Sequence, residues 1–140
     1  MTENFLINMA KESHKRFQDA AGNLTERDLR SLCESMENPE PLNLPSNDFH
    51  IITEIKKQSP SMGRLAPESF DVKQQAMSYI AGGASLLSVL TEPSRFLGGL
   101  EDLQLVANLE HSIPVIRKDF LVHPYQVSEA RHHGANGVLI

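Results

Sequence analysis

The feature that most constrains the fold is an alternation of strand-like runs and helix-like stretches between residues 51 and 140. The strand-like runs are short and rich in β-branched and aliphatic residues, and a stretch with helical features lies between each pair. We expect strands over residues 51–57, 84–91, 113–118 and 137–140, with helices at about 69–81, 100–109 and 124–134. Strands separated by single helices at intervals of roughly 25 to 35 residues call for a parallel sheet with right-handed crossovers. The predicted fold class is therefore α/β.

Two further helices are predicted before the first strand. From about residue 4 to residue 21, apolar and charged residues mix on a helical pattern, and Gly22 is the expected stop. The run T-E-R-D that begins at Thr25 is close to a capping box, with Asp28 in place of glutamate, and apolar residues at helical spacing follow it. The amino-terminal part is therefore predicted to be helical.

A proline-rich linker separates these helices from the alternating region. Three prolines fall between residues 38 and 47, a composition that can continue neither a helix nor the interior of a strand. We therefore divide the chain into an amino-terminal helical extension with its linker, residues 1–47, and an α/β unit, residues 48–140. The chain ends inside an apolar run, where a parallel strand would need cover on both faces. We expect it to be a piece of something longer.

Composition and charge exclude several classes of function. The net charge of -5 and the pI near 5.6 provide no basic field for a polyanion, so nucleic acid is not an expected partner. No apolar run approaches the roughly 20 residues of a membrane-spanning helix. The single Cys33 cannot form an internal disulfide, and the first residues lack a secretory pattern, which predicts a cytoplasmic location. His132 and His133 point about 100 degrees apart on a helix end, so no metal site is expected there.

Three charged residues are expected to meet at the carboxyl ends of the strands. Side chains alternate along a strand, so Glu54 and Lys56 share one face of the first strand, and Lys118 ends the third. At a surface, E-x-K would be an ordinary ion pair, but on a buried strand charges carry a large desolvation cost unless function retains them. Sites in parallel (β/α) folds lie at the carboxyl ends of the strands. The pattern therefore favours a functional site at these three residues.

Other candidate residues have weaker patterns. The loop S-P-S-M-G that begins at Ser59 has two hydroxyls and a glycine, which is too little to identify a phosphate site. Phe96 and Phe120 follow strand ends and could form either an apolar wall for an aromatic substrate or core plugs under the loops. Arg117 and Asp119 lie on the strand face opposite Lys118, and we expect a structural ion pair there.

The same residues fall in blocks that resemble one enzyme family. The segment E-I-K-K-Q-S-P-S-M-G resembles the E-x-K-x-x-S-P-S-x-G signature of indole-3-glycerol phosphate synthases. The segments G-G-A-S-L-L-S-V-L-T-E-P-S-R-F-L-G-G-L-E-D-L and I-P-V-I-R-K-D-F-L-V-H-P-Y-Q-V-S-E-A-R-H-H-G-A-N-G-V-L-I are similar to later parts of the same family. The blocks keep the family's order and spacing over residues 51–140. The first fifty residues match only in having helices before the barrel.

The resemblance implies a fold, a reaction and a set of residues. The fold would be the first half of a (β/α)8 TIM barrel, about four strands, and the reaction would be ring closure and decarboxylation of an anthranilate-derived sugar phosphate, without cofactor or metal. Lys118 matches the family's general acid. Lys56 matches the lysine that pairs with the substrate carboxylate or assists proton transfer, and Glu54 matches the glutamate that polarises this network. The positions that match substrate-binding residues are Ser59, Phe96 and Phe120.

The length of the chain bears on its expected activity and association. Barrels of this kind need about 250 residues and commonly bind phosphate with the loops after strands 7 and 8, so we expect little activity from this chain alone. Exposed strand edges and an apolar inner face predict self-association.

Another sugar-phosphate barrel, such as phosphoribosylanthranilate isomerase, is disfavoured because Cys33 precedes the first strand. A non-catalytic binding or assembly module remains open, although the three charged residues argue against it.

Overall fold

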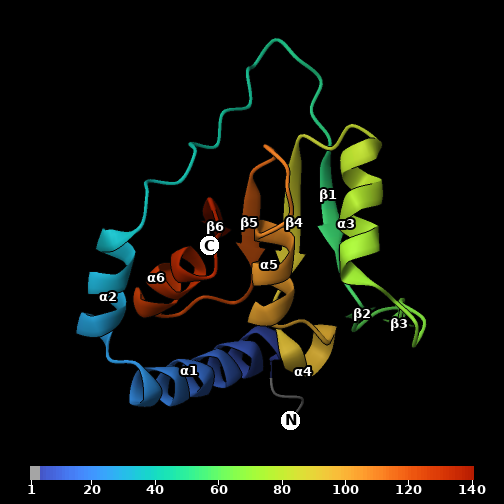
Figure 1. Ribbon diagram of the computed structural model, residues 1–140. Coiled ribbons are helices and arrows are strands. Elements are labelled where there is room, and N and C mark those ends of the chain that lie inside the picture. The colour runs from blue at the N-terminus through green and yellow to red at the C-terminus, as the bar shows by residue number, and fades with distance from the viewer. Residues whose placement is uncertain (1–3) are drawn as a thin grey trace.

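The computed structural model describes residues 4–140 and has the expected α/β architecture (Figure 1). The helices are α1 (Phe5–Asn23), α2 (Glu26–Ser35), α3 (Val72–Ala81), α4 (Pro93–Phe96), α5 (Leu100–Ala107) and α6 (Tyr125–His132). The strands are β1 (Ile52–Ile55), β2 (Gln58–Ser59), β3 (Gly63–Arg64), β4 (Leu86–Leu90), β5 (Val115–Lys118) and β6 (Gly137–Leu139). Strands β1, β4, β5 and β6 form one parallel sheet in that order, and β2 pairs with β3 in an antiparallel hairpin. The parallel α/β fold predicted from the sequence is confirmed.

Helices α3, α5 and α6 pack on one face of the parallel sheet and create the hydrophobic core. The core includes Ile55, Leu87, Val89 and Val115 from the strands, and Val72, Ala76, Leu103, Val106 and Ala130 from the helices. The opposite face, which we call the inner face, carries the alternate residues of each strand, including Glu54 and Lys118. Its central position Leu90 is buried, whereas Ile52 and Leu139 on the two outer strands are 58% and 48% exposed.

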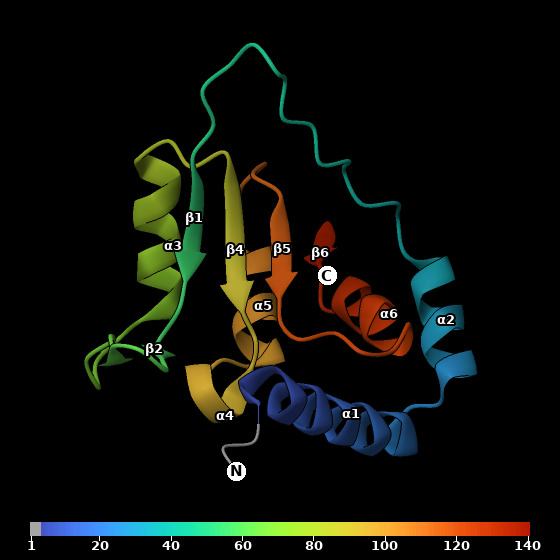
Figure 2. The same cartoon turned by 180° about the vertical axis from the view of Figure 1, so that it is seen from behind.

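Helix α1 lies beyond the carboxyl ends of the strands, toward which the arrowheads of β1, β4 and β5 point (Figures 1 and 2). Met9 and Ser13 on one side of this helix are fully buried. Farther along α1, the ring of Phe17 stacks on His123 with ring centroids 3.9 Å apart. The amino-terminal helix therefore packs directly on the loop that follows β5, at the end of the sheet where the charged residues were expected.

The observed helices differ from the predicted ones by one to three residues at their ends. The helix expected at about residues 69–81 begins at Val72, because the side chain of Asp71 accepts hydrogen bonds from the first free backbone N–H groups and so caps it there. Gly22 does not stop α1, which continues to Asn23. The predicted cap of α2 is confirmed, since Thr25 Oγ1 accepts a hydrogen bond from the Asp28 backbone N–H at 3.2 Å.

Two short elements were not predicted. The β2–β3 hairpin turns at Gly63, whose φ of +69° is in the left-handed region that glycine adopts without strain. The single turn α4 begins after Glu92, whose carboxylate accepts hydrogen bonds from the backbone N–H groups of Ser94 and Arg95. Both elements lie at the carboxyl ends of strands and therefore shape the rim of the site.

Two findings concern membranes and metals. No helix within residues 4–140 is long and apolar enough to cross a lipid bilayer. Among these same residues, no group of three or more His, Cys, Asp or Glu side chains is arranged to hold a metal ion. The Nδ1 atom of His133 lies 2.8 Å from the carbonyl oxygen of Glu129, at the carboxyl end of α6.

Candidate active site

Glu54 lies between two lysines at the carboxyl ends of the strands. Its Oε1 atom is 2.6 Å from the Nζ atom of Lys56, and its Oε2 atom accepts a hydrogen bond from Nζ of Lys118. Strand β4 separates β1 from β5, so the contact with Lys118 spans a whole strand. The span is possible because β4 places only the small Ser88 beside Glu54 and because the lysine side chain is long. The fold thus brings together the three charged residues that the sequence singles out.

The two lysines control the ionisation of Glu54. Burial by itself would raise the pKa of this carboxyl, but the hydrogen bonds and positive charges of Lys118 and Lys56 outweigh burial and hold the pKa below its usual value. Glu54 is therefore a carboxylate at neutral pH. One carboxylate beside two ammonium groups leaves an excess positive charge, which suits an anionic group on a ligand.

The three side chains are less buried than the sequence argument assumed. Those of Glu54, Lys56 and Lys118 are 25%, 30% and 39% exposed, respectively. The sequence argument took the strands to be covered on both faces, whereas α3, α5 and α6 pack on the face opposite these residues. Desolvation is therefore a weaker reason to single them out than expected, and their mutual contact is a stronger one.

A cavity with two aromatic walls lies beside the charged residues. Its volume is about 330 Å³, at the lower end of the roughly 300–1,000 Å³ typical of small-molecule sites. The lining residues are Glu54, Lys56, Leu90, Phe96, Lys118, Asp119, Phe120, Leu139 and Ile140. The rings of Phe96 and Phe120 are 6.3 Å apart between centroids, and the edge of Phe5 from α1 supports Phe120 at 6.0 Å. The two phenylalanines therefore line the cavity and are not part of the hydrophobic core.

Ser59 has a different position from the other candidate residues. It is buried in β2, and its Oγ atom accepts a hydrogen bond from the backbone N–H of Met62 at 3.2 Å. It lines neither the aromatic cavity nor a second cavity of about 420 Å³, which Glu54 and Lys56 line together with residues of α3 and of the loop before it. A role of Ser59 in binding substrate stays a prediction, while its observed contact stabilises the hairpin turn.

Arg117 and Asp119 form the structural ion pair predicted from the sequence, with 3.1 Å between Nη2 and Oδ2. The pair belongs to a larger buried network that the sequence did not reveal. Arg117 also donates to Glu129 at 2.8 Å, and Asp119 also pairs with Arg16 of α1 at 2.7 Å. Arg16 is 103 residues from Asp119 in the sequence, and no local pattern could have signalled this contact.

Comparison with known proteins decides the family. A sequence model described as indole-3-glycerol phosphate synthase matches residues 5–140. The chain belongs to the indole-3-glycerol phosphate synthase family. This confirms the resemblance seen in the sequence blocks, and the match to the family extends through α1 and α2 as well as the strands.

Individual relatives agree with this assignment to the synthase family. An indole-3-glycerol phosphate synthase of Rhodococcus opacus is 52% identical over 90 residues, which are 64% of this chain and 33% of the relative. One of Mycolicibacterium smegmatis is 48% identical over 106 residues, 73% of this chain and 38% of the relative. A multifunctional tryptophan biosynthesis protein of Phanerodontia chrysosporium is 38% identical over 126 residues, 83% of this chain and 16% of that protein. The chain thus spans about a third of the length of the synthases that it matches.

Proposed function

We propose that the chain supplies part of the active site of an indole-3-glycerol phosphate synthase in tryptophan biosynthesis. The reaction closes the ring of 1-(2-carboxyphenylamino)-1-deoxyribulose 5-phosphate and releases carbon dioxide and water. The observation that carries the proposal is the contact of Glu54 with both Lys56 and Lys118 at the edge of a cavity with two aromatic walls. Such a site offers a proton donor, a positive charge for a carboxylate and a surface for an aromatic ring.

Each side chain has a role that its position supports. Lys118 acts as the general acid, because its ammonium group faces the cavity and can donate a proton to the substrate carbonyl as the new carbon–carbon bond forms. Lys56 pairs with the substrate carboxylate until that group leaves as carbon dioxide. Glu54 holds both ammonium groups in place through its two oxygens. Phe96 and Phe120 contact the anthranilate ring.

An isomerase of the same pathway is a weaker candidate. Such an enzyme would need a reactive cysteine at a strand end, whereas Cys33 lies in α2 and its Sγ is 3.2 Å from the carbonyl oxygen of Ser128. Burial raises the pKa of the Cys33 thiol, which disfavours a thiolate. The remaining alternative is a non-catalytic binding or assembly module, and it predicts a different result in the binding experiment below.

The binding experiment uses the reduced analogue 1-(2-carboxyphenylamino)-1-deoxyribitol 5-phosphate. We expect the chain to bind it, and Lys118→Ala to bind about tenfold or more weakly, because a hydrogen bond to a charged group contributes roughly 1.5–3 kcal/mol. Lys73→Ala, on the exposed side of α3, is the control and should bind as the unchanged chain does. Equal affinity of the unchanged chain and Lys118→Ala, or no binding by either, would favour the assembly module.

The proposal extends to activity, association and location. We infer that the chain alone turns over little substrate, because it spans about a third of the length of the synthases that it matches, whereas sites on this fold are built by loops from all around the barrel. We also infer that it self-associates through the outer strands β1 and β6 and through the exposed Ile52 and Leu139 of the inner face.

A cytoplasmic location is consistent with the proposed biosynthetic reaction and with the single cysteine of the chain.

A further inference from the structure

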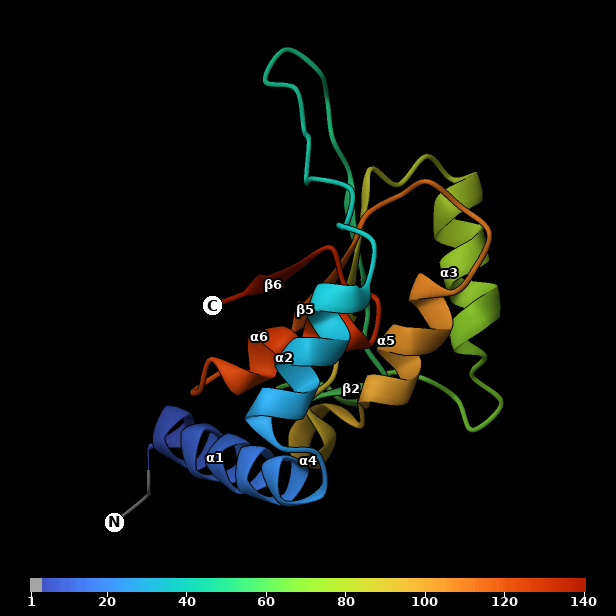
Figure 3. The same ribbon diagram turned by 60° about the vertical axis from the view of Figure 1, so that its left-hand side comes forward.

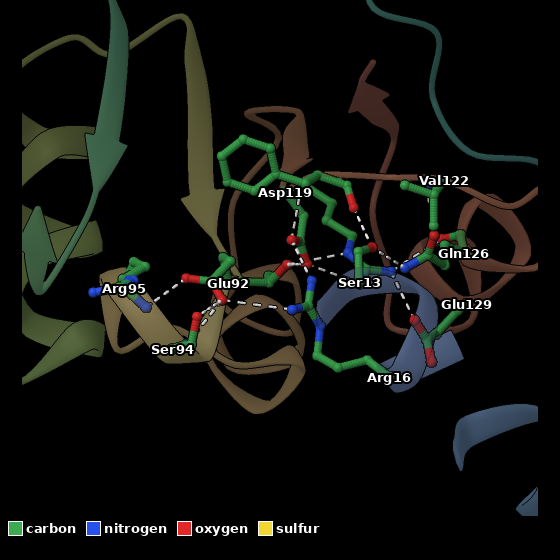
Figure 4. A network of polar contacts seen from close by, with 12 residues as sticks. Ser13, Arg16, Glu92, Ser94, Arg95, Asp119, Val122, Gln126 and Glu129 are labelled. Atoms are coloured by element: carbon green, nitrogen blue, oxygen red, sulfur yellow. Dashed lines mark hydrogen bonds and ion pairs between the residues drawn. The ribbon is translucent and has the colours of Figure 1, made fainter. Parts of the chain in front are cut away.

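An arginine of α1 connects the two segments that carry the aromatic walls of the cavity (Figure 4). The Nη2 atom of Arg16 lies 2.7 Å from Oδ1 of Asp119, and its Nη1 atom lies 3.5 Å from Oε1 of Glu92. Both carboxylates are completely buried, whereas the Arg16 side chain is 26% exposed. One guanidinium group therefore bridges two buried negative charges that belong to different strand ends.

Asp119 controls the segment that carries Phe120. Its Oδ1 atom accepts a hydrogen bond from the backbone N–H of Phe120 at 2.8 Å, and its Oδ2 atom accepts one from Thr91 Oγ1 at 2.8 Å. Asp119 also lies directly between Lys118 and Phe120 in the chain. A shift of this carboxylate would therefore move the backbone that carries the aromatic wall.

Glu92 controls the segment that carries Phe96. Its Oε1 atom accepts hydrogen bonds from the backbone N–H and the hydroxyl of Ser94, at 2.8 and 2.6 Å. Its Oε2 atom accepts one from the backbone N–H of Arg95 at 2.7 Å. These bonds fix the start of α4, a single turn whose last residue is Phe96. The orientation of this wall therefore depends on where Glu92 is held.

Other contacts of α1 hold Phe120 from the same direction. Ser13, one turn before Arg16, donates a hydrogen bond from its hydroxyl to the carbonyl oxygen of Phe120 and accepts one from Gln126 Nε2 at 2.9 Å. The ring of Phe5 packs edge-on against that of Phe120. Helix α1 thus reaches both the backbone and the ring of this wall.

We propose that Arg16 is a positioning residue that sets the relative placement of Phe96 and Phe120 and so determines which aromatic ligand packs against this pair of rings. Without its charge, Glu92 would lose this cation while Asp119 would keep its ion pair with Arg117, so the two buried carboxylates would repel each other more strongly and their segments would separate. Arginine suits this position because its planar group presents donors in two directions, whereas lysine is a single point charge. The proposal rests on the proposed function in so far as the ligand is an anthranilate ring.

The test reads the two walls directly by fluorine NMR of the whole chain made with fluorophenylalanine. The chain has six phenylalanines, and Phe96→Leu and Phe120→Leu assign the two signals of interest. We expect Arg16→Met to shift both signals and to weaken the binding of anthranilate about tenfold. Arg16→Lys should bind more weakly than the unchanged chain but better than Arg16→Met. Arg30→Met is the control, because Arg30 is largely exposed and its ion pair with Glu26, one turn away, is exposed too.

Each outcome decides the proposal. Unchanged wall signals and unchanged anthranilate affinity in a folded Arg16→Met would overturn it. If Arg16→Met does not fold, the comparison moves to Arg16→Lys, and wall signals identical to those of the unchanged chain there would equally count against it. If the unchanged chain does not bind anthranilate, the proposed function loses support, while the fluorine signals still test the positioning role of Arg16 independently.

Discussion

At the scale of single residues, the lowered pKa of Glu54 predicts a pH-dependent contribution to stability. A carboxyl whose pKa is lower in the folded state stabilises that state above its unfolded pKa of about 4.3, and this stabilisation is lost as pH falls through the folded pKa. We therefore expect Glu54→Gln to be less stable than the unchanged chain at pH 7. The difference should shrink below about pH 4.

Urea unfolding at a series of pH values measures this effect of Glu54. The difference at neutral pH should be under about 1 kcal/mol, because the pair is partly exposed and solvent screens it. A difference that stays constant from pH 7 to pH 3 would show that the hydrogen bonds from Lys118 and Lys56 do not control its ionisation. Equal stability of the two proteins at every pH would show that the ion pairs contribute nothing.

The residues of the site were predictable to different degrees. Glu54 and Lys56 could be placed on one face because strand alternation is local, and Lys118 could be placed at the same edge because parallel strands share their direction. The direct contact of Glu54 with Lys118 could not, since it depends on the strand order and on Ser88 between them. The role of Arg16 could not either, since only tertiary packing brings α1 to the site.

At the scale of elements, segments with a clear helical period or an apolar run were predictable, and short elements with neither signal were not. Helix α5 at 100–107 falls within its predicted range because its apolar residues recur at helical spacing, and strand β4 at 86–90 does so because it is a short, nearly continuous apolar run. The single turn α4 and the two-residue strands of the hairpin have too few residues for periodicity. They form because Glu92 caps the former and Gly63 turns the latter.

The connection from β4 through α4 to α5 depends on a close backbone approach at Gly98. A Cβ atom there would lie 1.9 Å from the carbonyl oxygen of Leu90, which is backbone at the end of a buried strand and cannot move easily. We expect Gly98→Ala to destabilise the fold by about 2 kcal/mol or more, as overpacking does. Its measurement is the free energy of unfolding in urea.

Gly22 is the matched control for Gly98. It lies inside α1, and a Cβ atom there would have no heavy atom within 4 Å apart from its own chain neighbours and helix backbone. Gly22→Ala should therefore stabilise the chain by roughly 0.5–1 kcal/mol, because alanine loses less conformational freedom in a helix. Effects of the same sign and size at both glycines would contradict this account of the turn after α4.

At the scale of the whole molecule, the amino-terminal helices and the sheet act together. The division into an extension of residues 1–47 and a half barrel of residues 48–140 stays a proposal that rests on the prolines. Helix α1 packs on the loop after β5 and contributes Arg16 to the buried network, and α2 packs beside α6, where Cys33 contacts Ser128 (Figure 3). Removal of residues 1–47 should therefore lower the free energy of unfolding and also change the placement of Phe96 and Phe120 in the aromatic cavity.

The exposed edges of the four-stranded sheet favour association between copies of the chain. In a closed barrel every strand has two neighbours, whereas β1 and β6 are the outer strands of this sheet. Ile52 and Leu139 project from these strands on the inner face and are largely exposed. Since exposed apolar patches and strand edges favour association, we expect the average mass measured by light scattering to rise with protein concentration from monomer toward dimer or beyond.

Two lysine substitutions on the inner face distinguish association through this face from nonspecific hydrophobic association. The double variant Ile52→Lys with Leu139→Lys should raise the dissociation constant of the assembly about tenfold or more, because like charges would have to approach in an apolar contact. Met77→Lys is the control, since Met77 is similarly exposed, at 51%, but lies on α3 at the other face of the sheet. If Met77→Lys dissociates the assembly as well as the double variant does, association does not use the inner face. If the unchanged chain stays monomeric across the concentration range, the open sheet is protected from pairing, and Lys56 and Lys118 on the same face are the charges that would explain it.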